Sequence, residues 1–147
     1  MMKLSYALDL KRKDVVAFVG AGGKTSAMFR LADELVAQGW RVLSTTTTRL
    51  AEEEMGRAPH RIEFGHIARP PATLAEHIKR HKHIFVFSKR EPDQKVRGFS
   101  PAWLDANLAD ISVVDTVLVE ADGSRRLPLK APLPNEPAIP SSATVIV

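Results

Sequence analysis

Residues 14–26, with the sequence DVVAFVGAGGKTS, decide the expected fold of this 147-residue chain. Residues 15–19 form a continuous apolar run, which is typical of a strand buried on both faces of a sheet. Glycines follow this run, and a helix with one apolar face is predicted after them. The apolar positions of that face are Met28, Leu31, Ala32 and Leu35. A buried strand, a glycine-rich turn and an amphipathic helix in this order predict the start of a parallel α/β sheet.

The rest of the chain continues the alternation of strands and helices. Strands are predicted over residues 41–45, 61–64, 84–87 and 113–119. Helices are predicted to begin at Thr73, where T-L-A-E fits a capping box, and at Ser100-Pro101. A short acidic helix is expected over residues 50–55, and the proline-rich residues 127–140 predict an extended loop. The expected fold is therefore α/β, a three-layer P-loop NTPase-like fold with a mostly parallel sheet.

The chain is expected to form one nucleotide-binding domain over residues 1–147. Its last apolar run, residues 143–147, predicts a parallel strand beside the strand of the glycine-rich loop. Nothing follows this strand to cover it. We therefore expect the chain to be the N-terminal portion of a longer protein, whose fold here lacks its C-terminal part.

The glycine-rich turn has the residues of a phosphate-binding loop in the position that such a loop requires. Its backbone N–H groups and the helix start would surround phosphate oxygens, the lysine would reach the outer phosphates, and the threonine would bind Mg²⁺. The predicted ligand-binding residues are Gly20, Ala21, Gly22, Gly23, Lys24, Thr25 and Ser26. The full pattern G-x-x-x-x-G-K-[ST] would need glycine where Phe18 stands, so the loop is shorter and resembles that of Mur ligases. The alternative is a tight turn with a solvated lysine.

Two further segments are predicted to reach the same edge of the sheet. Hydroxyls in the run STTTTR at residues 44–49 could contact phosphate or metal, with Thr46 and Thr47 as the predicted ligands, although threonine also simply suits strands and turns. In VEADGSRR at residues 119–126, Glu120 and Asp122 follow an apolar strand, where a carboxylate holds Mg²⁺ or orients a nucleophilic water. The spacing does not decide which acid takes which role.

Basic residues follow these acids in the chain. Arg125 and Lys130 could clamp an anionic substrate or a transferring phosphoryl group, and we assign them with Glu120 and Asp122 to the predicted catalytic set. The alternative is a rigid basic surface loop without a ligand.

Composition narrows the function classes. The chain is 44% hydrophobic and 26% charged, and it has no cysteine, so disulfides and thiolate metal sites are excluded. No stretch is long and apolar enough to predict a membrane span, and a cytoplasmic protein is expected. Basic residues and all five histidines gather between Arg57 and Arg97. This stretch permits a nucleic-acid binder as a remote alternative, but a solvated or anion-facing surface is favoured. His77, His81 and His83 have metal-ligand spacing, yet the cationic residues between them favour a solvated helix end.

Three blocks together resemble the YqeC family of accessory proteins for selenium-dependent molybdenum hydroxylases. The blocks are GAGGKTS, STTTTR and VEADGSRRLPLKAPLPNEPAIP. The resemblance implies a P-loop domain and a site role for residues of the third block, namely Asp122, Arg125, Lys130 and Glu136. The stretch KVRG at residues 95–98 also resembles a family stretch, K-x-[KR]-G, of unknown role.

The functional hypothesis combines these observations. We expect Mg²⁺-dependent binding of a nucleoside triphosphate, ATP or GTP, with hydrolysis or phosphoryl or nucleotidyl transfer. The family resemblance implies that this activity serves maturation of a selenium-dependent molybdenum hydroxylase, with that enzyme or its cofactor as partner. The main alternative is a non-catalytic, nucleotide-gated chaperone or cofactor carrier. Turnover separates the two, because both bind nucleotide and only the enzyme forms product.

Overall fold

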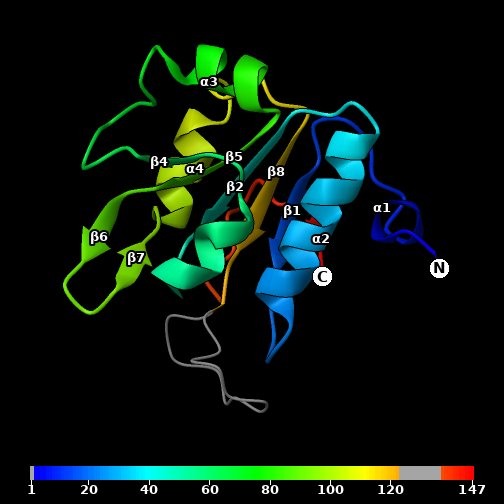
Figure 1. Ribbon diagram of the computed structural model, residues 1–147, viewed down its shortest axis with the longest axis horizontal. Coiled ribbons are helices and arrows are strands. Elements are labelled where there is room, and N and C mark those ends of the chain that lie inside the picture. The colour runs from blue at the N-terminus through cyan, green and yellow to red at the C-terminus, as the bar shows by residue number, and fades with distance from the viewer. Residues whose placement is uncertain (1, 123–136) are drawn as a thin grey trace.

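The computed structural model describes residues 2–122 and 137–147. In chain order its elements are α1 (Leu4–Ala7), β1 (Val15–Phe18), α2 (Lys24–Ala37), β2 (Val42–Thr46), β3 (Arg49–Ala51), the 3₁₀ helix η1 (Glu52–Arg57), β4 (Arg61–Glu63), α3 (Leu74–His81), β5 (His83–Phe87), β6 (Lys89–Glu91), β7 (Lys95–Arg97), α4 (Pro101–Asn107), β8 (Thr116–Glu120) and β9 (Val145–Ile146). Figure 1 shows their arrangement.

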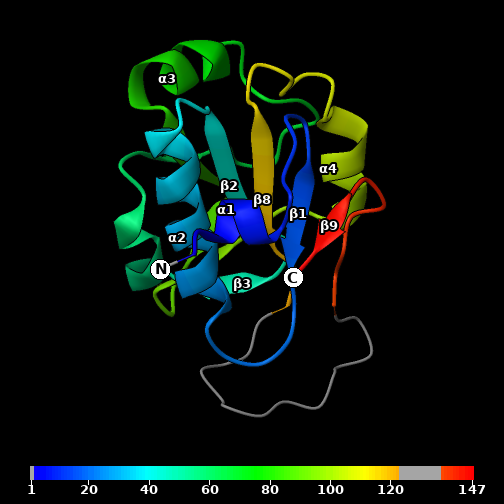
Figure 2. The ribbon, with the colours of Figure 1, turned by 90° about the vertical axis from the view of Figure 1, so that its right-hand side faces the viewer.

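A parallel sheet forms the centre of the fold. It has six strands in the order β4-β5-β2-β8-β1-β9, and every neighbouring pair is parallel. Figure 2 shows β2, β8, β1 and β9 side by side. The predicted α/β fold with a mostly parallel sheet is confirmed.

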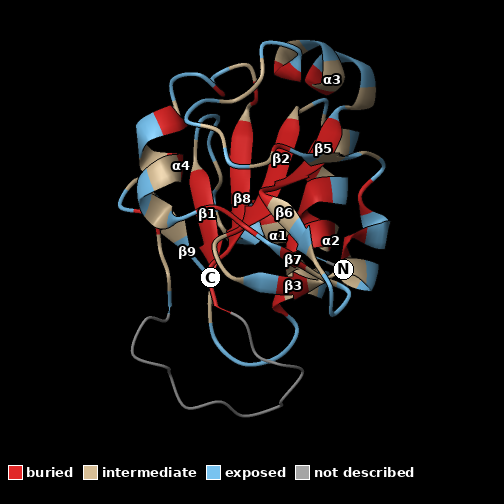
Figure 3. Ribbon diagram, turned by 90° about the vertical axis from the view of Figure 1, so that its left-hand side faces the viewer, coloured by how far each residue is buried: buried red, intermediate tan, exposed pale blue. Residues whose placement is uncertain are grey.

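Side chains alternate along each central strand and so divide the core between the two faces of the sheet. Val16 and Phe18 of β1 belong to the cluster that contains the apolar residues of α2, whereas Val15 and Ala17 belong to the cluster that contains those of α3 and α4. Figure 3 shows the central strands as buried throughout. Because both faces of the sheet are covered, β1 is a continuous apolar run in the sequence, VVAF.

The helix boundaries follow local signals in most places. Gly39 has a φ of +83° just after α2, where a left-handed residue commonly ends a helix. Ser100 caps α4, its Oγ accepting from Trp103 N–H at 3.1 Å. Helix α3 does begin after Thr73, but the predicted capping box is wrong, because Thr73 has helical φ and ψ and its side chain makes no cap hydrogen bond. The acidic helix starts at Glu52 as η1, while Leu50 lies in β3.

A small antiparallel sheet was not predicted. It has the order β3-β7-β6 and follows the ends of β2 and β5. Ion pairs connect its strands and the turn between β6 and β7: Arg49 contacts Glu91 at 2.6 Å and Asp93 at 2.5 Å, and Arg97 contacts Glu91 at 2.9 Å. Arg97 belongs to the basic stretch of the sequence, and it is paired with a carboxylate.

The final strand, β9, lies beside β1, as predicted. Val145 and Ile146 pair with Val16 and Ala17, and Val19 N–H donates to Val147 O at 2.9 Å. β9 is the edge strand of the sheet, and Ile146 is 58% exposed rather than buried as its apolar run suggested. In the described part of the chain, no helix has the length and apolar character needed to cross a bilayer.

Candidate nucleotide-binding site

The order of the strands places a topological switch point at the carboxyl ends of β1 and β8. From β1 the chain passes over β8 to reach β2, and from β8 it passes over β1 in the opposite direction to reach β9. Ligands of open parallel sheets bind where the connections diverge in this way. The glycine-rich loop follows β1 and the acidic residues follow β8, so the topology brings the first and third predicted motifs together.

The backbone of the loop explains its glycines. Gly20, Gly22 and Gly23 have φ values of +98°, +72° and +75°, which residues with a side chain rarely adopt. A Cβ at any of the three would meet no atom within 4 Å, so the loop borders open space. Gly23 is the N-cap of α2 and offers no side chain to the first N–H groups of the helix. The loop therefore has both the donors and the room that a phosphate group needs.

Lys24, the first residue of α2, lies inside the loop rather than in solvent. Its side chain is buried, and Nζ donates to Gly20 O at 2.5 Å. Its charge also acts on Glu120, whose carboxylate it stabilises. The ammonium is therefore held over the loop, where it can exchange the carbonyl for a phosphate oxygen.

Thr25 and Glu120 connect the loop to the end of β8. Thr25 Oγ1 donates to Glu120 Oε2 at 2.7 Å, although the two residues are 95 positions apart. A hydroxyl and a carboxylate are ligands that Mg²⁺ accepts, alongside water and phosphate oxygens. The donor set at this position fits a magnesium ion.

Burial dominates the electrostatics of Glu120. The residue is 4% exposed, and desolvation raises the pKa of its carboxyl from 4.5 to about 7. The Thr25 hydrogen bond and the charge of Lys24 oppose this shift, while the carboxylates of Glu54 and Asp122 add to it. A bound cation would favour the ionised form.

Asp122 contacts the first glycine of the loop. Gly20 N–H donates to Asp122 Oδ2 at 3.3 Å, and the residue is buried. The two acids thus have different partners: Glu120 contacts the threonine after the lysine, and Asp122 contacts the first glycine.

Thr46 ends β2 beside Glu120 and Thr47 follows it, but the hydroxyls of both residues donate to main-chain oxygens. Thr46 Oγ1 donates to Glu120 O at 2.9 Å, and Thr47 Oγ1 donates to Ala138 O at 2.6 Å. The first bond joins the ends of β2 and β8, and the second joins the residue after β2 to the segment that precedes β9. Direct contact of either hydroxyl with a nucleotide stays a prediction. Arg125, Lys130 and Glu136 lie outside the described residues.

Two residues near the site were missed by sequence reasoning, and a third, Gly98, was noted without a role. Glu54 of η1 acts on the carboxylate of Glu120, and Arg57 of η1 reaches Ser26 O of α2 at 3.4 Å. Gly98 follows β7, and a Cβ there would lie 1.6 Å from Thr46 O. This close approach accounts for the glycine of the KVRG stretch. The KVRG resemblance marked Gly98 in the sequence, whereas no pattern marked Glu54 or Arg57 as site residues.

The histidines are arranged differently from the predicted solvated helix end. His83 is buried in β5 and shares a 2.7 Å hydrogen bond with Ser44 Oγ. Burial lowers the pKa of His83 to about 4. His77 and His81 lie on α3, half-buried, and meet His60 instead.

Comparison with known proteins identifies the family. The model of the YqeC family, described as YqeC protein, matches residues 16–147. The chain is 43% identical over 138 residues to a protein of Escherichia coli (strain K12) named "Uncharacterized protein YqeC"; the match covers 93% of this chain and 51% of that protein. The chain thus spans about half the length of this curated relative.

Among solved structures, the crystal structure of FtsY from Mycoplasma mycoides matches with a TM-score of 0.41 and 15% identity, covering 79% of this chain and 34% of that one. The family model covers far more than half of the chain, and the resemblance seen in the three sequence blocks is confirmed. The chain belongs to the YqeC family.

Proposed function

We propose that the chain binds a nucleoside triphosphate, ATP or GTP, with Mg²⁺ between the loop after β1 and the acidic end of β8. The hydrogen bond from Thr25 to Glu120 carries the proposal, because it joins two predicted metal ligands from distant parts of the sequence. The buried lysine over a loop of three positive-φ glycines supports the same assignment.

Each residue then has a defined task. The N–H groups of the loop and of the first turn of α2 bind phosphate oxygens, and the Lys24 ammonium leaves Gly20 O to neutralise an outer phosphate. Thr25 Oγ1 and the Glu120 carboxylate hold the magnesium ion, which when bound supplies charge neutralisation and polarisation of the phosphate. Asp122, held by Gly20 N–H, is assigned to orient the attacking group.

The reaction assigned to the site is hydrolysis or transfer of a phosphoryl or nucleotidyl group. Arg125 and Lys130 are proposed to neutralise charge on the transferred group, on the ground of their place in the sequence after the acidic strand end. On the resemblance of the three sequence blocks, we also propose that this activity serves maturation of a selenium-dependent molybdenum hydroxylase in the cytoplasm. That enzyme or its cofactor is the proposed partner.

Calorimetric titration with ATP and GTP, each with and without Mg²⁺, tests the binding. Lys24→Ala should weaken nucleotide affinity by about 2–3 kcal/mol, the range of a charge-assisted hydrogen bond, and leave the fold intact. The control is Lys79→Ala, which removes an exposed lysine of α3. Equal nucleotide affinity of the Lys24 variant and the control would refute the phosphate assignment. A separate assay for release of inorganic phosphate or pyrophosphate by the unmodified chain distinguishes catalysis from nucleotide binding alone.

A further inference from the structure

Three histidines from two segments meet at the edge of the sheet opposite to the phosphate loop. His77 and His81 are four positions apart on α3, and His60 precedes β4. Their potential ligand atoms all lie within 4.8 Å of one another, and His60 Nε2 is 3.1 Å from His77 Nδ1. The rings of His60 and His81 are stacked with centroids 3.8 Å apart. No other group of three or more histidine and acidic residues in the described ranges has ligand atoms so arranged.

The backbone that carries these side chains is fixed on both sides. Phe85 N–H donates to His60 O at 2.9 Å, which attaches the segment before β4 to the central sheet. Leu74 and Ile78 of α3 are buried in the core cluster, and the half-buried His77 and His81 lie beside them on the same side of the helix. His77 and His81 share a face because residues four apart on a helix are neighbours. The fold itself therefore brings the three histidines together.

The chemistry of the group selects a class of metal. All donors are imidazole nitrogens, and the cationic side chain of Arg80 acts on His60. Mg²⁺ and Ca²⁺ require oxygen ligands and would gain little here. Zn²⁺, Co²⁺ and Ni²⁺ bind imidazole, and three histidines with an open fourth position form a known type of zinc coordination.

The distances are close to those that such a metal needs. Three nitrogens at 2.0–2.1 Å from a tetrahedral ion are about 3.3 Å from one another. Starting from separations of at most 4.8 Å, the ligand atoms must approach by about 1.5 Å at most. Rotation of the half-buried rings out of the stack would bring the nitrogens closer together.

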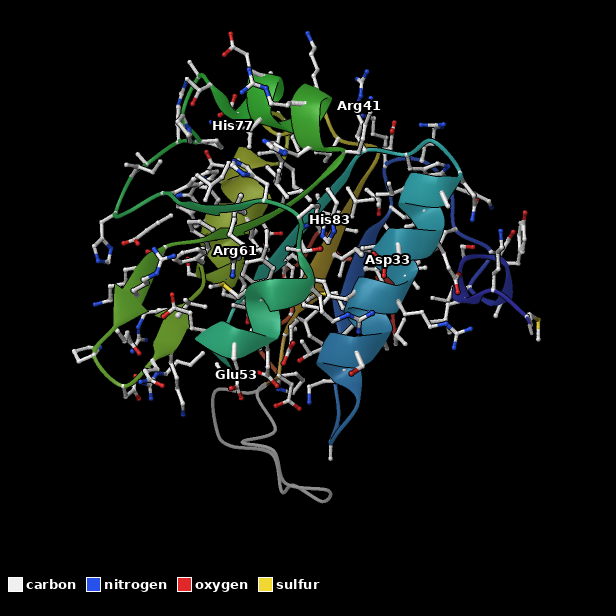
Figure 4. The ribbon with its side chains drawn as sticks, in the orientation of Figure 1. Asp33, Arg41, Glu53, Arg61, His77 and His83 are labelled. Atoms are coloured by element: carbon white, nitrogen blue, oxygen red, sulfur yellow. The ribbon has the colours of Figure 1, made fainter. Side chains whose placement is uncertain are left out.

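We propose that His60, His77 and His81 bind one divalent transition metal ion of the zinc class. Since His60 lies on the segment before β4 and the other two lie on α3, the ion would join these segments outside the core. The phosphate loop follows the carboxyl end of β1, whereas this group lies at the amino ends of β4 and β5. Figure 4 shows His77 at the α3 end of the molecule and Glu53, on η1, at the other end. The metal site is therefore separate from the proposed nucleotide site.

Titration of the unmodified 147-residue chain with Zn²⁺, followed by calorimetry, tests the proposal. We expect one ion per chain, a rise in the thermal unfolding midpoint, and no saturable Mg²⁺ binding at the histidines. Titration with Co²⁺ gives a second readout, because tetrahedral coordination produces intense visible absorption bands that octahedral coordination does not. Hyperfine-shifted imidazole N–H signals from three histidines would identify the ligands without any substitution.

Matched variants locate the site. His60→Ala, His77→Ala and His81→Ala should each lower Zn²⁺ affinity by about a hundredfold or more, since loss of a ligand costs at least as much as loss of an outer-shell partner. His66→Ala removes an exposed histidine outside the group and should leave affinity unchanged. Glu120→Gln should also leave it unchanged, which separates this site from the nucleotide site. Absence of saturable Zn²⁺ binding to the unmodified chain, or equal affinity in the His77 and His66 variants, would overturn the proposal.

Discussion

Replacing Glu120 by glutamine changes the charge of the site while nearly keeping its shape. The residue is 4% exposed, and burial raises the pKa of its carboxyl from 4.5 to about 7. The native state therefore binds a proton at this carboxyl more tightly than the unfolded chain does. The resulting stabilisation is fully present below pH 4.5 and is lost as the pH rises through 7. Glutamine cannot ionise and avoids this loss.

The magnitude follows from the difference between the two pKa values. A difference of about 2.5, at about 1.4 kcal/mol for each pH unit, corresponds to about 3 kcal/mol. Above pH 8 we expect Glu120→Gln to be more stable than the unmodified chain by up to about 3 kcal/mol. Below pH 4.5 the two should have similar free energies of unfolding.

The unmodified chain must be compared with the Glu120→Gln variant, because the pKa shift of His83 changes the free energy of unfolding with pH in the opposite direction to that of Glu120. Burial lowers its pKa from 6.5 to about 4, so stability present above pH 6.5 is lost as the pH falls toward 4. In the unmodified chain the two effects offset one another between pH 4.5 and 6.5. The difference between the variants isolates the contribution of Glu120, since His83 is common to both.

Urea unfolding in steps from pH 4.5 to pH 8.5, followed by circular dichroism, measures this difference. Addition of Mg²⁺ above pH 7 should stabilise the unmodified chain and not the glutamine variant, because the ion needs the carboxylate. A free-energy difference between the two proteins that does not change with pH would refute the reasoning, since it would show that Glu120 is ionised normally in the native state.

Three further predictions concern single contacts. Gly98→Ala should destabilise the chain by about 2 kcal/mol or more, because the new Cβ would lie 1.6 Å from Thr46 O; Gly56→Ala, with open space around it, is the control in the same urea measurement, and equal stability of the two would contradict the contact. Ser100→Ala should cost about 1 kcal/mol in urea unfolding through loss of the α4 cap, and an unchanged midpoint would show that the cap contributes nothing. Thr25→Val should raise the pKa of Glu120 further by removing its hydrogen bond, so the Mg²⁺ dependence of nucleotide binding should weaken; an unchanged Mg²⁺ titration would argue against a metal ligand here.

The central part of the fold could be predicted because its determinants are local. Val15–Phe18 is apolar on both sides, the glycines that follow adopt positive φ, and α2 begins at the lysine. These features lie within a few residues of one another, so the local sequence alone indicates a strand, a turn and a helix in this order. The position of the last strand beside β1 could also be predicted, since a short apolar run at this point needs a neighbouring strand for its backbone hydrogen bonds.

The remaining features depend on contacts between distant segments. The strands β3, β6 and β7 are three residues each and rich in charge, so periodicity cannot distinguish them from loops. His60 lies 17 positions before its partner His77, and only the pairing of β4 with β5 brings them together. The sequence could not decide whether Glu120 or Asp122 contacts Thr25, because this depends on the register of β8 against β1.

Gly98, which follows β7, packs directly against Thr46 at the end of β2, with no room for a side chain between them. Thr46 is bound through its hydroxyl to the main chain of Glu120, whose side chain in turn holds the threonine of the loop. Gly98 N–H and Phe99 N–H donate to Thr48 O and Thr46 O on the other side. The base of the β6–β7 hairpin and the end of β8 both contact the end of β2, so the three are connected mechanically. A displacement of the β8 end is therefore expected to move the base of the hairpin as well.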